Sequence, residues 1–276
     1  MAQVASKRKH DLKARKHVEM CERELLEQIG LPKQFSPTID VYLRPATMED
    51  AGQVAGIYNH YVKNSHITED QEPVSPEDVA GIICTSQQEA LPFIVAVLGV
   101  IPDTYTRQTS RRKPQNAMVL VREEIVGFTF AETFNFGWGG NRKGRSRYTA
   151  NLQLYVSPHH VRHGIGRNLL DRLLVTLKST YSFMDACAWV NPGANKVYET
   201  GGAGKWHQLL FQLPILKVDD PNLSWVEGFL KTQFFFKLEN IQRSWGRTKA
   251  GKGVLPSFTD TAIFQVDSLQ EEEYFD

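Results

Sequence analysis

The 276-residue chain has little cysteine, no excess of one sign of charge and no long apolar run. Cys21, Cys84 and Cys187 form no C-x-x-C pair, which argues against a disulfide framework or a zinc site and is typical of a reducing compartment. A formal net charge of +1 gives no global field that would attract nucleic acid. No apolar stretch approaches a transmembrane span, and the N-terminus is too charged for a secretory signal. We therefore expect a cytoplasmic protein without a membrane partner, the nucleus being the alternative compartment.

The basic N-terminal segment forms a pattern of its own. Lysines and arginines crowd the beginning of residues 1–40, and apolar residues from Val18 to Ile29 repeat with a loose helical period that Gly30 and Pro32 end. We expect a helical extension packed on its own domain by a few leucines, because a lone basic cluster is common on surfaces. The alternatives are a nuclear-localisation patch or an anchor for ribosome, RNA or acidic protein, and nucleic acid is expected as a partner only through this extension.

The remaining chain alternates strand and helix patterns, which predicts one α/β domain over residues 41–270 and an acidic tail at 271–276. Capping signals at Thr47 and Ser75 precede residues with helical spacing. Strands are expected at 41–44, 91–100, 118–121, 125–134 and 152–156. Three excursions are predicted as insertions, at about 101–117, 137–148 and 181–204.

The stretch from Leu152 to Leu177 combines a strand, a turn with two glycines and a helix. Leu152, Leu154 and Val156 alternate with other residues, and a stripe of leucines that ends at Leu177 gives the helix a buried face. A helix start behind such a turn exposes several backbone N–H groups around a partial positive charge. The stretch therefore predicts an anion-binding turn, most simply one for phosphate.

This turn resembles the acetyl-CoA-binding motif of the GNAT superfamily of N-acetyltransferases, Gln/Arg-x-x-Gly-x-Gly/Ala between a strand and a helix. The match here is Val161-x-x-Gly164-x-Gly166, in which both glycines fit and the leading Gln or Arg is absent. Arg162, one residue later, is the candidate for the missing donor. The glycines matter because a side chain there would hold the pyrophosphate away from the backbone amides.

A second match supports the first. Residues 43–62, followed by Asn64-Ser65 and Glu72-Pro73, resemble the opening of the phosphinothricin and methionine sulfoximine N-acetyltransferase branch of that superfamily. The resemblance implies the α/β GNAT fold, with a mixed central sheet of about six to seven strands flanked by helices, to which this chain adds its N-terminal helix.

For the site, the resemblance implies acetyl-CoA as cosubstrate and direct acetyl transfer to an amine. The strand would pair with the pantetheine arm, a backbone N–H near Tyr155 or Val156 would polarise the thioester carbonyl, and the turn would hold the pyrophosphate. The residues assigned to the cofactor are Leu154, Tyr155, Val156, Val161, Arg162, His163, Gly164, Ile165, Gly166 and Arg167.

The amine must lose a proton before it can attack. In the phosphinothricin branch a glutamate on the signature strand is a candidate for this role, and its position falls on Asn151 here, which cannot act as a base. Glu132 on the neighbouring predicted strand is the first substitute. Asp260, Glu72 and His60 are weaker substitutes, and for each of these groups a structural salt bridge or packing role is the alternative.

Two alignments compete after the signature helix. In one, Asn191-x-x-Ala194-x-x-Val197-Tyr198 matches the superfamily's second motif, where a tyrosine can protonate the departing thiolate. In the other, which we prefer, residues 181–204 are an insertion, and the sheet continues with strands at 206–216, 235–241 and 259–266 and a helix at 223–234. Tyr198 then loses its catalytic role.

The helix at 223–234 is expected to turn Trp225 and Leu230 inward. Gly246-x-x-x-x-Gly251-Lys252 imitates a phosphate loop, but Gly253 stands where a hydroxyl must bind magnesium. The histidines of the turn have no carboxylate or cysteine partner that would complete a metal site, so no metal is expected.

The sequence therefore predicts an acetyl-CoA-dependent N-acetyltransferase acting on a small molecule or an amino-acid analogue. A peptide or protein amine is the substrate alternative, and an acyl-CoA-binding module with little catalysis is the functional alternative. The sequence does not decide between a monomer and a homodimer.

Overall fold

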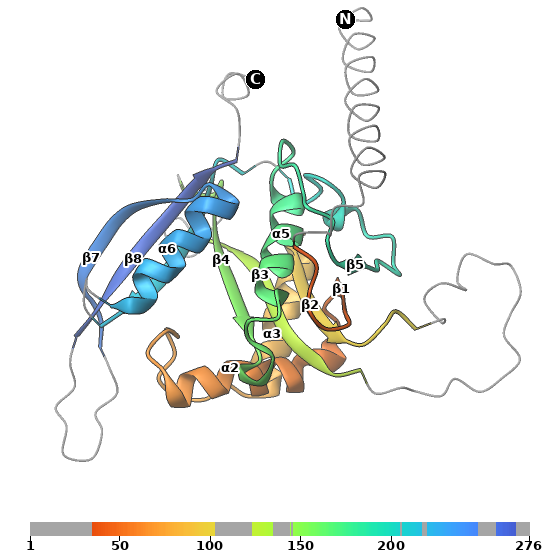
Figure 1. Cartoon of the computed structure of the whole chain (residues 1–276), viewed down its shortest axis with the longest axis horizontal. Helices are drawn as coiled ribbons and strands as arrows, with labels where there is room; N and C mark the ends of the chain where they lie inside the picture. The colour runs from red at the N-terminus through yellow and green to blue at the C-terminus, as the bar shows by residue number, and fades with distance from the viewer. Residues whose placement is uncertain are drawn as a thin grey trace, which may run out of the picture. The chain divides into compact units, whose positions relative to one another are not determined.

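A computed structural model describes residues 35–102, 123–134, 144, 146–204, 206–216, 220–247 and 258–268. The chain divides after Ser36 into an N-terminal unit and a compact unit of residues 37–276, and every element below belongs to the second unit (Figure 1). Several predicted features lie outside the described residues. These are the N-terminal helix, the strand at 118–121, most of the excursions at 101–117 and 137–148, and the acidic tail.

The compact unit is built on an 8-stranded mixed sheet in the order β5-β1-β2-β3-β4-β6-β8-β7. Neighbours are antiparallel except β1 with β5 and β4 with β6, which are parallel. The strands are β1 (Val41–Pro45), β2 (Phe93–Leu98), β3 (Ile125–Thr133), β4 (Thr149–Val156), β5 (Ala188–Trp189), β6 (Gln208–Ile215), β7 (Lys237–Arg247) and β8 (Phe258–Asp267). The sheet exceeds the predicted six to seven strands because β5, only two residues long, gives no periodic signal.

The described helices begin where the capping signals predict them. Ser75 and Asp78 form a capping box at the start of α3, and Thr47 and Asp50 do the same at η1. The elements are η1 (Met48–Asp50), α2 (Ala51–Asn64), α3 (Pro76–Gln88), η4 (Pro158–His160), α5 (Ile165–Leu177), η5 (Lys196–Tyr198) and α6 (Pro221–Phe234). None of the helices in this part of the chain is long and apolar enough to cross a membrane.

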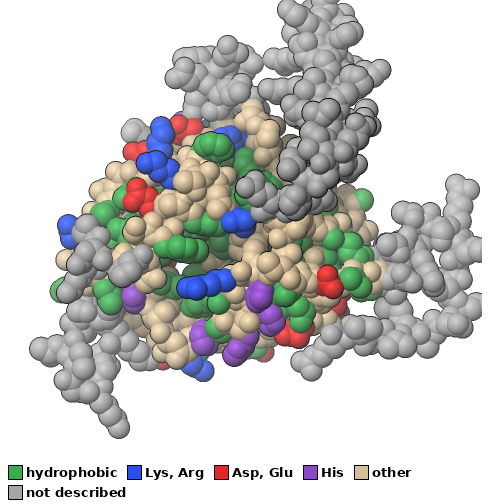
Figure 2. Space-filling model, viewed as in Figure 1, with side chains coloured by type: hydrophobic (Ala, Val, Ile, Leu, Met, Phe, Trp, Pro, Cys, Tyr) green, Lys and Arg blue, Asp and Glu red, His purple; other side chains and the backbone are tan. Residues whose placement is uncertain are grey.

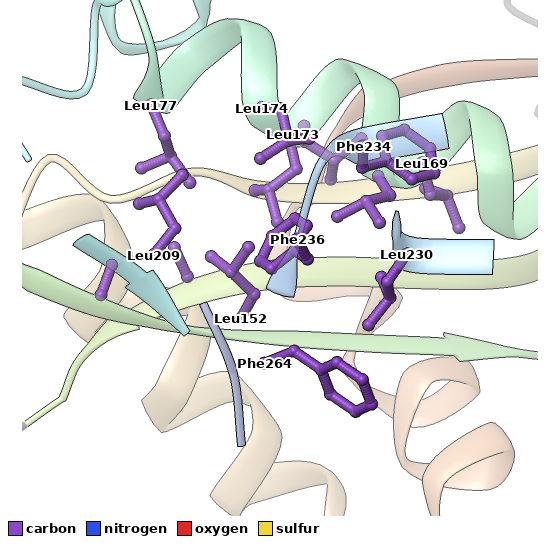
Figure 3. Packing of buried hydrophobic residues seen from close by; sticks show 14 of the residues in the cluster. Leu152, Leu169, Leu173, Leu174, Leu177, Leu209, Leu230, Phe234, Phe236 and Phe264 are labelled. Atoms are coloured by element: carbon purple, nitrogen blue, oxygen red, sulfur yellow. The ribbon is translucent and has the colours of Figure 1, made fainter. Parts of the chain in front are cut away.

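The two faces of the sheet support two separate hydrophobic clusters. In β4, Leu152 belongs to the cluster under α5 and α6, whereas Tyr155 belongs to the cluster under α2 and α3. Successive side chains of a strand point to opposite faces, so this alternation fixes which residues can meet on each side. Figure 3 shows leucines of α5 packed toward Leu152 and Leu209 of the sheet, with Leu230 and Phe234 of α6 beside them.

One inward assignment was wrong. Leu230 is buried as predicted, but the Trp225 side chain is 67% exposed and stacks on Phe229 with ring centroids 5.6 Å apart. The helical period places Trp225 and Phe229 near the same stripe of α6. The indole ring of Trp225 stacks on Phe229 at the edge of the helix and does not enter the core.

The central strands β4 and β6 part along their length. They pair from Thr149 with Gln208 to Leu152 with Phe211, and then each continues without the other. Beyond that point β4 pairs with β3, and β6 pairs with β8. The sheet therefore has a V-shaped gap at its centre, and α5 begins just after the open end of β4.

Candidate active site

The turn before α5 has the backbone that its glycine pattern predicts. Gly164 is the N-cap of α5 with φ 81°, and Arg162 also lies in the left-handed region with φ 65°. Thr38 holds the turn, because its N–H donates to the His163 carbonyl at 3.1 Å and its Oγ1 lies 2.6 Å from His163 Nδ1. The N–H groups of a first helical turn have no intrahelical acceptor, so this turn can receive an anion.

The first turn of α5 packs directly on the open end of β4. A Cβ added to Gly166 would lie 3.4 Å from Val156 Cγ2 and 3.8 Å from Leu154 Cδ2. This close approach brings the strand residues 154–156 and the turn residues 161–167, all predicted for the cofactor, to one end of the V-shaped gap. The start of α5 presents the backbone N–H groups that a phosphate group requires.

Helix α6 closes the other side of this region. Arg167 Nε donates to Gln233 Oε1 at 2.6 Å, which ties the first turn of α5 to the last turn of α6. Figure 2 shows a hollow in this face of the molecule, bordered by a Lys or Arg side chain and by several histidines. Side chains of His159, His160 and His163 lie on the turn itself. None of the described residues forms a group of His, Cys, Asp and Glu suited to a metal ion.

The opposite face of β4 carries polar groups near the point where its pairing with β6 ends. Glu132 on β3 lies opposite Asn151 on β4 in the sheet register, and Asn151 Nδ2 donates to Glu132 Oε1 at 2.8 Å. Gln153 Nε2 lies 3.3 Å from the same oxygen, and Tyr155 Oη donates to Gln153 Oε1 at 3.2 Å. Glu132 is exposed, whereas Asn151 is 6% exposed and its Oδ1 has no hydrogen-bond partner in the structure. Glu132 thus lies opposite Asn151, one residue before the pairing of β4 with β6 ends.

Two carboxylates of this face come from a loop that the sequence did not indicate. Tyr58 on α2 donates to Asp70 Oδ2 at 2.7 Å, and its ring meets the Tyr155 ring edge-on at 5.1 Å. Burial first, and then the charges of Glu132 and Asp70, raise the pKa of Glu69. Glu69 and Asp70 lie between Asn64-Ser65 and Glu72-Pro73, which both belong to the match with the phosphinothricin branch. This position was the sequence signal that could have indicated them.

The weaker candidates for the base come from elements other than β3 and β4. Asp260 on β8 accepts from Arg243 Nη1 at 2.8 Å and from the Ser244 backbone N–H at 3.0 Å, which is a structural role. His60 is exposed on α2 beside Asn64. Glu72 is exposed in the loop between α2 and α3.

Tyr198 lies in the core. The residue is 5% exposed, its hydroxyl donates to the Phe93 carbonyl at 3.1 Å, and the Phe93 N–H donates back at 3.3 Å. Burial raises the pKa of Tyr198 above its ordinary value. A hydroxyl that bridges to β2 is bound to the opposite side of β3 from the gap, so this placement favours the alignment in which Tyr198 has no part in catalysis.

Comparison with known proteins yields one family. Residues 86–202 match the model of the Acetyltransferase (GNAT) family, a range that runs from the end of α3 through α5 to the turn after η5.

Solved structures share the whole fold at low sequence identity. A Salmonella typhimurium protein described as an acetyltransferase, solved with its cofactor acetyl-CoA, has 17% identity and a TM-score of 0.54 over 84% of this chain and 96% of its own. A phosphinothricin acetyltransferase from Sinorhizobium meliloti, in complex with acetyl-CoA, has 19% identity and a TM-score of 0.53 over 83% and 89%. A ribosomal-protein-alanine N-acetyltransferase from Brucella melitensis has 16% identity and a TM-score of 0.50 over 82% and 98%. The chain therefore has the GNAT fold, and its residues 86–202 match the GNAT family model.

Proposed function

We propose that the protein is an acetyl-CoA-dependent N-acetyltransferase that transfers an acetyl group directly to the amine of a small molecule. The observation that carries this proposal is the parting of β4 and β6 beside the glycine turn of α5. In this proposal, the pantetheine arm lies in the gap between β4 and β6, and the turn binds a phosphate. Glu132 lies on the other face of the sheet, hydrogen-bonded to Asn151.

The cofactor side of the proposal rests on backbone geometry. The residues that would hold acetyl-CoA are 154–156 along β4 and 161–167 around the start of α5, where N–H groups and the helix dipole favour a pyrophosphate. Acetyl-CoA would supply the acetyl group as a thioester. A backbone N–H near Tyr155 or Val156 would stabilise negative charge on the thioester oxygen.

The acceptor side rests on Glu132. In the transfer, the amine nitrogen bonds to the acetyl carbon, the carbon–sulfur bond breaks, and CoA leaves with the sulfur electrons. One amine proton goes to Glu132, directly or through one water, because Asn151 and Gln153 are amides and cannot accept it. The amide donors of these two residues orient the carboxylate toward the strand where the thioester would lie.

Two alternatives have support of their own. A protein amine is favoured by the likeness to a ribosomal-protein-alanine N-acetyltransferase. A binding module with little catalysis is favoured by Val161, which replaces the donor residue of the motif, and by Asn151, which replaces a carboxylate.

A thiol-release assay over a panel of small amines and peptides, paired with calorimetry of acetyl-CoA binding, separates these functions. The proposal expects saturable acetyl-CoA binding and amine-dependent thiol release that is faster with a small amine. Binding without release above background would identify a module, and faster release with a peptide would identify a protein acetyltransferase. A chain that binds no acetyl-CoA would refute the proposal as a whole.

A further inference from the structure

The backbone of β4 directs its hydrogen-bonding groups alternately toward its two neighbouring strands. Ser157 N–H donates to the Val126 carbonyl at 2.8 Å, in line with the register of β3 and β4. The odd-numbered residues of β4 therefore direct their N–H and C=O groups toward β3, and the even-numbered residues direct theirs toward β6. The Tyr148 carbonyl, which accepts from His207 N–H at 2.7 Å just before β6, agrees with this alternation.

Leu154 and Val156 are the even-numbered residues of β4 beyond its last pair with β6, which is Leu152 with Phe211. Among the described residues, no strand pairs with them on this side. Both residues are half-buried, so they are accessible to a ligand in the gap. Because each residue carries one N–H donor and one C=O acceptor, this edge of β4 presents donors and acceptors in alternation.

Tyr61 of α2 reaches this edge and changes it. Its Oη donates to the Val156 carbonyl at 2.5 Å, and its half-buried ring packs on the Tyr155 ring with centroids 5.7 Å apart. Burial raises the pKa of Tyr61, which keeps the hydroxyl protonated. A hydroxyl has one hydrogen to donate and two lone pairs that can accept. Because the Val156 carbonyl uses the hydrogen, Tyr61 Oη presents an acceptor in place of that carbonyl.

We infer that Tyr61 is a binding residue for the pantetheine arm of acetyl-CoA, with its Oη accepting from an amide N–H of the arm beside Leu154 and Val156. This inference rests on the proposed function and adds a side-chain contact to a site otherwise formed by backbone groups. An arm with amides fits this edge because each amide carries one donor and one acceptor. Tyr61 lies outside the strand and the turn that the sequence analysis assigned to the cofactor.

Calorimetric titration with two ligands tests the inference. Acetyl-CoA carries the arm, whereas adenosine 3′-phosphate 5′-diphosphate keeps the nucleotide and the pyrophosphate and lacks the arm. Tyr61→Phe removes only the hydroxyl. We expect this variant to bind acetyl-CoA at least about fivefold more weakly, as the loss of one hydrogen bond predicts, and to bind the arm-free nucleotide with unchanged affinity. The matched control is Tyr148→Phe, which removes a hydroxyl at the other end of β4 and should change neither affinity.

Ester analogues of acetyl-CoA identify the group that donates to Tyr61. Replacing one amide of the arm at a time by an ester removes its N–H and nearly keeps its shape. For one of the two amides, we expect the wild type to bind the ester analogue at least about fivefold more weakly than acetyl-CoA. Tyr61→Phe should bind that analogue and acetyl-CoA with similar affinity, because the two changes remove the same interaction.

The outcomes distinguish this inference from the proposed function. Equal weakening of both ligands by Tyr61→Phe would overturn the inference, because it would show that the hydroxyl only supports the structure around the turn. Unchanged acetyl-CoA affinity in Tyr61→Phe would overturn it as well, and so would ester analogues that the wild type and the variant discriminate equally. These results leave acetyl transfer intact. A wild type that binds no acetyl-CoA would remove the proposed function itself, and the inference with it.

Discussion

At the residue scale, the unusual feature is a carboxylate held by amides. At the position where the resemblance to the phosphinothricin branch implies a glutamate, this chain has Asn151, and Glu132 lies opposite it on the neighbouring strand. Because the two residues are directly opposite in the antiparallel register, the carboxylate stays at nearly the same place on the face of the sheet. We propose that Glu132 takes the role that the resemblance implies for a glutamate at position 151.

Substituting Glu132 by Gln tests this role. The change keeps the side chain's shape but removes the proton acceptor, and general bases contribute about a hundredfold or more to rate. We expect kcat to fall by at least about a hundredfold, with acetyl-CoA affinity unchanged, in the thiol-release assay. Glu239→Gln on the exposed part of β7 is the control. A Glu132→Gln enzyme that retains its kcat would place the base elsewhere.

At the element scale, residues 181–204 are more than an insertion on the surface. They supply β5, which pairs with β1 at one edge of the sheet. Asp171 of α5 anchors the segment by accepting from Tyr181 Oη at 2.8 Å, and Arg172 of α5 donates to the Tyr198 carbonyl at 2.8 Å. The guanidinium of Arg172 also lies over the Trp189 ring, 4.0 Å from its centroid. The helix that begins at the cofactor turn thus holds this segment through its later turns.

The turn that ends the segment requires a glycine. A Cβ on Gly202 would lie 1.9 Å from the Lys196 carbonyl oxygen, whereas a Cβ on Gly193 would meet nothing within 4 Å. We expect Gly202→Ala to lower the free energy of unfolding by about 1–3 kcal/mol and Gly193→Ala to change it by less than about 0.5 kcal/mol. Urea denaturation measures both. Equal midpoints for the two variants would contradict the close approach of the backbone at Gly202.

Periodic elements could be predicted from the sequence, and contacts between elements could not. The strand and helix patterns around Leu152 to Leu177 and the capping signals at Thr47 and Ser75 are local, so they persist in the fold. Asp70 lies near Tyr155 because Tyr58 of α2 contacts both residues, a tertiary contact that helical or strand periodicity does not give. The prediction that Trp225 is buried was wrong for the same reason. Periodicity shows which stripe of a helix is apolar, but it does not show how wide the buried contact of that stripe is.

At the scale of the whole compact unit, the sheet divides the proposed chemistry between its two faces. The turn of α5 is on one face and Glu132 is on the other, and the pairing of β4 with β6 ends between them. A cosubstrate and an amine would therefore approach from opposite faces and meet along β4 after Leu152, where its pairing with β6 has ended.

Calorimetric titration with acetyl-CoA tests the central claim most directly. Gly164 and Gly204 both have a left-handed backbone, with φ 81° and φ 98°, but only Gly164 belongs to the cofactor turn. A valine is strained at either position. Comparing the two variants therefore separates the loss of the cofactor turn from the general effect of backbone strain. We predict one saturable site in the wild type and in Gly204→Val, and binding at least about tenfold weaker in Gly164→Val because its helix start no longer faces the pyrophosphate. No binding by the wild type, or equal affinity in all three proteins, would contradict an acetyl-CoA site at this turn.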